Sequence, residues 1–139
     1  MSKLPPEIAK MHFLLVDDFQ SMRVVMAAQM KAYGVTQITF AKSGSEAYAT
    51  IKGLQTSAAP INFVMADMMM KEGSGIDLTK LIRGDATTKH LPLLMISSMN
   101  DINQVLEAVQ AGVDDYIVKP WQEAELFKKI ISVASKAKK

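Results

Sequence analysis

The chain has 139 residues, no cysteine, two histidines and a formal net charge of +2 at pH 7. This length suits one domain that buries its own core without disulfides or structural metal. The lack of cysteine excludes thiol catalysis and cysteine-ligated zinc or iron-sulfur centres, and two histidines argue against a histidine-rich metal site. No run approaches about 18 consecutive apolar residues, so we expect a soluble, cytoplasmic protein that does not enter a membrane.

Apolar runs alternate with amphipathic segments along the chain, as expected for five β/α units. We expect a strand and then a helix, in chain order, at 12–16 and 20–33, 36–41 and 45–55, 61–66 and 75–84, 91–97 and 101–111, and 114–118 and 121–136. The run from Leu93 to Ile96 lacks the alternation of polar and apolar residues that a half-exposed strand shows. The strands are therefore predicted to form a parallel sheet that helices cover on both faces.

The predicted helices carry boundary signals. Gly34 can end the first helix in a left-handed conformation, and Ser43 and Ser74 can cap the second and third, because an acidic residue follows each serine three positions later. A mostly apolar stripe on the first helix is formed by Met22, Val25, Met26, Gln29, Met30 and Tyr33.

The ends of the chain differ from its middle. We divide the chain into an N-terminal extension at 1–10, one domain at 11–136 and a basic tail at 137–139, with both ends expected to be loose. The lysines near the carboxyl end are not interleaved with aromatic residues, so they indicate a solvated helix end and no nucleic-acid partner.

Acidic residues close two of the predicted strands. Asp17 and Asp18 follow the first strand, and Asp67 follows the third. If the strands are parallel, these carboxylates meet at the carboxyl edge of the sheet, where open α/β folds bind ligands. Carboxylates about 4 Å apart repel one another by roughly 4 kcal/mol per pair at an effective dielectric near 20. The sequence therefore predicts a site for a hard cation, Mg²⁺, at this edge.

Two further polar residues stand at strand ends. Ser97 closes the fourth predicted strand and Lys119 follows the fifth. Taken alone, Ser97 fits a helix cap, Lys119 fits a solvated lysine, and an acidic pair fits the start of a helix. Taken together, they suit phosphoryl transfer to a carboxylate, for which Asp67 is the best nucleophile candidate. Pro120 allows a cis bond after Lys119 that would fix the lysine's direction, and the sequence leaves this isomer open.

The residues that carry a family resemblance occur in order over about residues 10–135. As a set they resemble the receiver domain of bacterial two-component signalling, and specifically the single-domain, CheY-like chemotaxis response regulators. They are the run 16–23, Asp67 with Met70 and Gly75, the run 96–98, Ala111 with Gly112, and the run 116–120.

This resemblance implies a flavodoxin-like, doubly wound (βα)5 fold, whose five-stranded parallel sheet has the order 2-1-3-4-5. It also implies that Asp67 is the phosphoacceptor. Asp17 and Asp18 would hold Mg²⁺ together with Asp67, and the backbone carbonyl of Met69 would complete the protein ligands. Lys119 would contact the phosphoryl oxygens.

The resemblance further implies a switch. The Ser97 hydroxyl would move toward the phosphoryl group while the Tyr116 ring turns inward, which remodels the face formed by the fourth helix, the fifth strand and the fifth helix. The expected partners are a sensor histidine kinase and an output protein such as a flagellar motor switch component. The chain is expected to be a monomer and not an enzyme, apart from its own phosphorylation and dephosphorylation.

The chain departs from the family pattern after the third strand. The family often has a proline after the Met70 position, where this chain has Lys71 and lacks that constraint on φ. Met69 and Met99 stand where polar residues are common, and thioethers are weak hydrogen-bond acceptors. We therefore predict that these two methionines exclude the attacking water and lengthen the lifetime of the aspartyl phosphate.

The sequence lacks the motifs of two other classes of phosphate-handling protein. A haloacid dehalogenase-type phosphohydrolase needs an Asp-x-Asp motif, but the residues two positions after Asp17 and Asp67 are Phe19 and Met69. A P-loop nucleotide-binding protein is excluded because its glycine-lysine motif is missing. A phosphate sink that drains a kinase without signalling onward has the same sequence features, so this alternative stays open.

Overall fold

The computed structural model describes residues 2–70, 74–98 and 102–136. Within these ranges, short strands and helices alternate after a first helical turn. The elements are α1 (Pro6–Ala9), β1 (His12–Val16), α2 (Gln20–Ala32), β2 (Gln37–Ala41), α3 (Gly44–Leu54), β3 (Phe63–Asp67), α4 (Gly75–Gly84), β4 (Leu93–Ser97), α5 (Ile102–Ala111), β5 (Asp115–Val118) and α6 (Glu123–Lys136).

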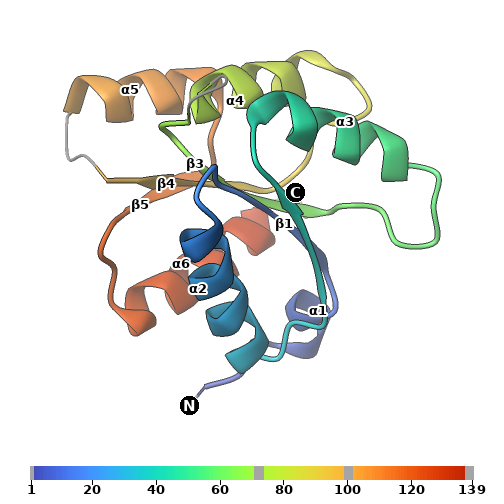
Figure 1. The fold of residues 1–139 in the computed structure, drawn as a ribbon, viewed down its shortest axis with the longest axis vertical. Helices are drawn as coiled ribbons and strands as arrows, with labels where there is room; N and C mark the ends of the chain where they lie inside the picture. The colour runs from blue at the N-terminus through green and yellow to red at the C-terminus, as the bar shows by residue number, and fades with distance from the viewer. Residues whose placement is uncertain (1, 71–73, 99–101, 137–139) are drawn as a thin grey trace.

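The strands form one parallel sheet in the order β2-β1-β3-β4-β5. The predicted fold class and strand order are confirmed. Helices α3, α4 and α5 lie on one face of this sheet, and α2 and α6 lie on the other together with the short α1 (Figure 1). Parallel strands place all their carboxyl ends at the same edge, so the strand-end residues are brought together by topology alone.

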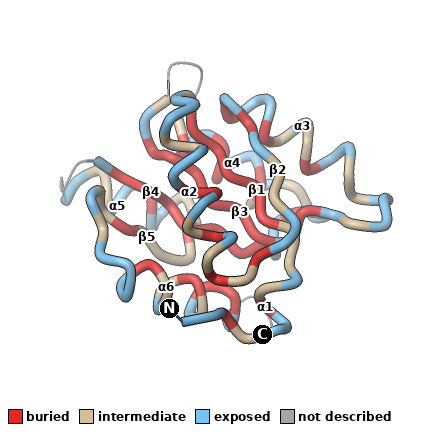
Figure 2. The backbone as a smooth tube through the Cα atoms, turned by 60° about the horizontal axis from the view of Figure 1, so that its bottom comes forward, coloured by how far each residue is buried: buried red, intermediate tan, exposed pale blue. Residues whose placement is uncertain are grey.

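The central strands are buried on both faces, which explains their unbroken apolar sequences. Every residue of β3 and β4 is buried, and in Figure 2 these strands and β1 run through the interior. Phe13 and Leu15 point into the core between the sheet and helices α1, α2 and α6, whereas Leu14 and Val16 point into the core beneath α3 and α4. The sheet therefore holds its carboxyl edge between two packed layers.

The boundary signals of the helices are largely confirmed. Gly34 has a φ of +100°, the left-handed conformation in which glycine is favoured. The Ser74 hydroxyl accepts from the Asp77 N–H, and the Asp77 carboxylate accepts from the Ser74 N–H, so α4 begins with a complete capping box. The apolar stripe on α2 is narrower than predicted, because Val25 is 54% exposed. Periodicity shows which residues share a face, but not how wide a strip the neighbouring elements cover.

The N-terminal segment is more ordered than the sequence indicated. Pro6–Ala9 is helical, and the side chains of Leu4 and Ile8 are buried in the core on the α2 and α6 side. The Leu4 N–H donates to the Tyr33 carbonyl at 2.9 Å. The expectation that residues 1–10 are loose is therefore wrong for this segment. Of the two buried residues, Ile8 lies in the helix, and four helical residues are too few for periodicity to reveal.

Arg83 connects the loops that precede β4 and β5. The Arg83 guanidinium donates to the carbonyls of Gly112 at 2.8 Å and Leu91 at 2.6 Å, and lies 3.1 Å from the Asp114 carboxylate. Asp114 in turn accepts from the Leu93 N–H at 2.8 Å. These contacts fix the relative position of the two strands whose opposite ends carry Ser97 and Lys119.

Candidate functional site

Three carboxylates meet at the carboxyl edge of the sheet. Asp17 and Asp18 follow β1, and Asp67 is the last residue of β3, which pairs directly with β1. One carboxylate oxygen of each residue lies within 4.8 Å of the others. The Asp17 side chain is fully buried and Asp67 is only 4% exposed, so the charges are poorly screened by water.

A lysine completes the charged cluster. The Lys119 Nζ atom lies 3.0 Å from Oδ2 of Asp67 and 3.4 Å from Oδ2 of Asp17. The Lys119–Pro120 peptide bond is cis, the isomer that the sequence left open. The Lys119 N–H donates to the Ser97 carbonyl at 2.7 Å, which joins the ends of β4 and β5. Lys119 therefore faces two of the three acidic side chains, and its single positive charge does not balance the three carboxylates.

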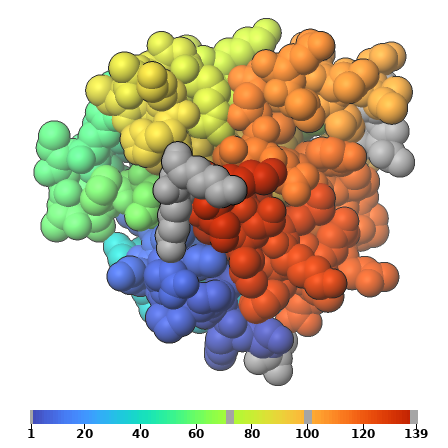
Figure 3. All heavy atoms as spheres, turned by 180° about the vertical axis from the view of Figure 1, so that it is seen from behind, coloured from blue at the N-terminus to red at the C-terminus, as the bar shows by residue number. Residues whose placement is uncertain are grey.

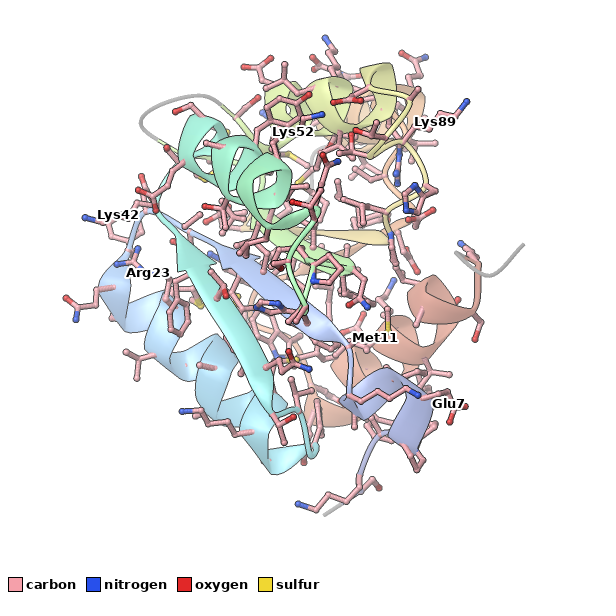
Figure 4. All side chains as sticks on the ribbon, turned by 90° about the vertical axis from the view of Figure 1, so that its right-hand side faces the viewer. Glu7, Met11, Arg23, Lys42, Lys52 and Lys89 are labelled. Atoms are coloured by element: carbon pink, nitrogen blue, oxygen red, sulfur yellow. The ribbon has the colours of Figure 1, made fainter. Side chains whose placement is uncertain are left out.

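Backbone N–H groups hold the carboxylates in place. Oδ1 of Asp17 accepts from the Phe19 N–H at 2.9 Å, and Oδ1 of Asp67 accepts from the Met69 N–H at 3.1 Å. In both residues Oδ2 faces Lys119. The Arg23 guanidinium donates to the Asp17 carbonyl, a contact that the sequence did not predict. Figure 4 shows Arg23 and Lys42 by the carboxyl ends of β1 and β2, and Met11 by the opposite end of β1.

The remaining predicted residues lie around this cluster. Ser97 ends β4 and is 1% exposed, and its hydroxyl lies 4.0 Å from the sulfur of Met68. Tyr116 on β5 is half-buried and packs against the core beneath α3, α4 and α5. The Met69 side chain is 52% exposed. Met99 lies outside the described residues. The roles predicted for these side chains stay predictions.

A glycine that the sequence marked only by resemblance lies directly against the Asp67 backbone. A Cβ atom at Gly75 would lie 2.5 Å from the Asp67 carbonyl oxygen and 2.6 Å from the sulfur of Met95. The Gly75 N–H also donates to the Met68 carbonyl at 2.9 Å. The first residue of α4 thus packs against the end of β3 at a distance that only glycine allows.

The donor set fits a hard divalent cation. All the side-chain ligands in the cluster are carboxylate oxygens, the ligand type that Mg²⁺ and Ca²⁺ prefer and that softer transition metals do not select. The shared negative charge also needs a counterion beyond Lys119. The acidic cluster of Asp17, Asp18 and Asp67 is therefore able to bind a metal ion.

The buried position of Asp17 has a consequence for stability. Burial raises the pKa of the Asp17 carboxyl, and the nearby Asp67 charge adds to this increase, while the Phe19 N–H and Lys119 oppose it. A raised pKa in the folded state means that the ionised carboxylate destabilises the fold above that pKa, and that the cost disappears as the pH falls. Without metal, we expect Asp17→Asn to increase the free energy of unfolding near neutral pH, with a gain that shrinks on acidification.

Urea unfolding in the presence of a chelator at about pH 7.5 and about pH 4.5 measures this effect. Asp85→Asn is the control, because hydrogen bonds from Lys52, Tyr48 and Thr87 lower the pKa of Asp85. A lowered pKa stabilises the fold above the unfolded-state value, and both pH values lie above it, so Asp85→Asn should lose stability by a similar amount at each pH. The same pH trend in both variants would contradict the role assigned to burial at Asp17.

Comparison with known proteins identifies the class. The family model of the response regulator receiver domain matches residues 13–131, and the chain belongs to this family. Two chemotaxis proteins are among its relatives. The chain is 39% identical over 120 residues to chemotaxis protein CheY-3 of Vibrio cholerae, covering 86% of this chain and 88% of the relative. It is 35% identical over 120 residues to chemotaxis protein CheY of Pseudomonas aeruginosa, covering 86% and 93%.

The solved structures agree with this assignment at the level of the fold. The structure of the chemotaxis response regulator CheY4 of Vibrio cholerae superposes with a TM-score of 0.75 at 24% identity, covering 89% of this chain and 98% of the other. Among the described residues, no helix has the length and apolar character needed to span a membrane. The chain is thus a receiver domain with CheY-like chemotaxis homologues.

Proposed function

We propose that this chain is a phosphorylation switch. Asp67 accepts a phosphoryl group from a histidine kinase, and phosphorylation changes how the chain binds an output protein. The observation that supports this most directly is the cluster of three carboxylates within 4.8 Å of one another, with Lys119 Nζ 3.0 Å from Asp67. The chain acts in the cytoplasm as a monomer, and the only reactions it catalyses are its own phosphorylation and dephosphorylation.

In the proposed transfer, a carboxylate oxygen of Asp67 attacks the phosphorus of a phosphohistidine. A P–O bond forms as the P–N bond breaks, and the leaving imidazole keeps the electron pair and takes up a proton. Lys119 is close enough to offset the negative charge on the phosphoryl oxygens. Asp17, Asp18, Asp67 and the backbone carbonyl of Met69 would hold a Mg²⁺ ion, which would supply further charge neutralisation.

The proposed switch links phosphorylation of Asp67 to strands β4 and β5. A phosphoryl group adds about −1.5 to −2 charge beside the end of β4. The Ser97 hydroxyl turns toward it and the Tyr116 ring turns inward, which shifts a two-state equilibrium. The hydrogen bond from the Lys119 N–H to the Ser97 carbonyl supports this coupling, because it joins the two strand ends that respond.

An exposed apolar face on α5 favours an output role over a phosphate sink. Ile102, Leu106 and Val109 are 71%, 52% and 54% exposed, and their spacing puts them on one face of the helix. Apolar side chains gathered on one exposed face are typical of protein-binding surfaces. We propose that this face, together with β5 and α6, contacts the output protein, such as a flagellar motor switch component.

The test combines labelling with partner binding. Incubation with acetyl phosphate and Mg²⁺ should give one acid-stable, hydroxylamine-sensitive phosphoryl group per chain, and chelation should prevent it. Immobilised phosphorylated and unphosphorylated protein are then compared for binding to a flagellar motor switch subunit. Binding only to the phosphorylated form supports the output role. Labelling with equal binding to both forms would contradict the output role, and the absence of labelling would contradict the whole proposal.

The exposed Met69 side chain leads to a prediction about the lifetime of the phosphorylated state. Hydrolysis needs a water molecule in line behind the phosphoryl group, and a thioether is a poor acceptor for holding it. Met69→Asn should speed the loss of label by about two- to tenfold, the effect of one added hydrogen bond. The decay rate of labelled protein measures this. Met69→Leu is the control and should decay like the wild type; equal rates for all three proteins would leave Met69 without a role in hydrolysis.

A further inference from the structure

A lysine from α6 reaches two neighbouring residues of β5. The Lys129 Nζ atom lies 3.2 Å from Oδ1 of Asp115 and 5.3 Å from the centroid of the Tyr116 ring. The Lys129 and Asp115 side chains are 24% and 28% exposed, so most of each side chain is shielded from water. The three residues form a small cluster at the edge of the sheet, outside the acidic site.

Lys129 and the Tyr116 ring come from opposite faces of the sheet. Neighbouring residues of a strand point to opposite faces, and Ile117 belongs to the core on the α6 side while Tyr116 packs against the core on the α5 side. The Tyr116 ring therefore lies on the face opposite α6. Lys129 reaches it around the edge of β5, which pairs with β4 alone among the described strands. Figure 3 shows the orange atoms of α5 and the red-orange atoms of α6 on the same side of the molecule.

We propose that Lys129 is a positioning residue for Tyr116. Its ammonium group holds the phenol ring in the position that the ring has at the edge of β5. A cation over the face of an aromatic ring is attracted by the ring's quadrupole. A lysine alone has many rotamers, so its ammonium group needs a second contact to stay over the ring. Asp115 supplies that contact. The consequence of this inference for signalling rests on the proposed switch role of Tyr116.

Asp115, which contacts Lys129, also contacts Tyr116. Oδ1 of Asp115 accepts from the Tyr116 N–H at 2.8 Å and is also the atom closest to Lys129. One carboxylate oxygen therefore links the backbone of Tyr116 to the cation that faces its ring. If the Tyr116 ring moves away from Lys129, the contacts of Asp115 with Lys129 and with the Tyr116 N–H can both remain.

We expect Lys129 to favour the position of the Tyr116 ring beside it over the alternative ring position. Loss of one partly exposed cation–π contact should raise the population of the alternative ring position by about two- to fivefold. If the ring moves on phosphorylation as proposed, Lys129→Met should raise partner binding of the unphosphorylated chain by a similar factor. Binding of the fully phosphorylated chain should hardly change, because its equilibrium already lies on the other side.

Fluorine NMR of fluorotyrosine-labelled protein tests the positioning directly. The chain has three tyrosines, so Tyr116→Phe assigns the relevant signal. In the unphosphorylated state, Lys129→Met should shift that signal, and Lys129→Arg, which keeps a cation over the ring, should restore it. Lys128→Met is the matched control, because Lys128 is exposed on the same helix, and it should leave the signal unchanged.

Asp115→Asn provides a second variant, since asparagine keeps the Oδ1 acceptor for the Tyr116 N–H but loses the charge that anchors Lys129. It should move the signal in the same direction as Lys129→Met, by less. A Tyr116 signal that is identical in wild type, Lys129→Met and Lys128→Met overturns the inference. The wild-type signal with acetyl phosphate and Mg²⁺ tests the proposed switch separately. If it does not move, Tyr116 loses its switch role, and the unphosphorylated comparison still decides what Lys129 does.

Discussion

Asp67→Asn should abolish phosphorylation by acetyl phosphate while leaving the fold intact. Asparagine has the same shape, and its Oδ1 can still accept the Met69 N–H that holds the native side chain at 3.1 Å. It lacks the nucleophilic carboxylate and removes one of the three acidic ligands. We expect at least a hundredfold lower labelling, weaker Mg²⁺ binding, and a free energy of unfolding within about 1 kcal/mol of the wild type.

The measurements are the initial rate of labelling, a Mg²⁺ titration and urea unfolding in a chelator. Asp77→Asn is the control, because it neutralises a carboxylate in the first turn of α4, outside the acidic cluster. It should label at the wild-type rate and lose only part of the capping box that begins α4. Stoichiometric labelling of Asp67→Asn at the native rate would show that another residue is the phosphoacceptor.

Gly75→Ala should damage both the stability and the chemistry of the site. Its new Cβ atom would lie 2.5 Å from the Asp67 carbonyl oxygen. The Met95 sulfur, at 2.6 Å, can move by a rotation of a flexible side chain, but the Asp67 carbonyl belongs to the backbone of β3. Overpacking of this kind costs about 1–3 kcal/mol. We also expect labelling to slow by about tenfold or more, because small displacements of a nucleophile are costly.

Gly53→Ala separates this clash from the general effect of adding a methyl group. Gly53 lies in α3, and among the described residues nothing comes within 4 Å of a Cβ atom built there. Alanine is favoured over glycine inside a helix, so this control should gain about 0.5–1 kcal/mol and label normally. Thermal unfolding and labelling rates of the two variants provide the comparison. A Gly75→Ala protein that is as stable and as reactive as Gly53→Ala would contradict the steric argument.

The sequence predicted those features that depend on local pattern and topology. Unbroken apolar runs such as Leu93 to Ile96 predicted buried strands, and parallel strands bring residues at their ends to one edge whatever the details of packing. This is why Asp17, Asp67 and Lys119 could be predicted to lie together, although they are far apart along the chain. Their chemical roles came from resemblance and stay proposals.

The features that the sequence did not reveal depend on single long-range contacts. Arg23 and Arg83 have the spacing of ordinary polar helix residues, and only the folded chain shows that their guanidinium groups reach backbone carbonyls. The contact between Lys129 and Tyr116 crosses the edge of the sheet and leaves no periodic signal. The close approach of Gly75 to Asp67 likewise depends on the distance between two backbone segments, which cannot be deduced from composition or residue spacing.

The Arg83 contacts hold together one end of the β4–β5 strand pair. At the amino ends of β4 and β5, one guanidinium group bonds to the carbonyls of Gly112, Lys89 and Leu91 and to the Asp114 carboxylate. These contacts oppose sliding of the two strands past each other at that end. At the other end of the same strands lie Ser97 and Lys119, next to the acidic cluster. If phosphorylation adds charge at that cluster as proposed, we expect local rotation of side chains and loops and not a shift in strand register, because Arg83 holds the far ends of β4 and β5.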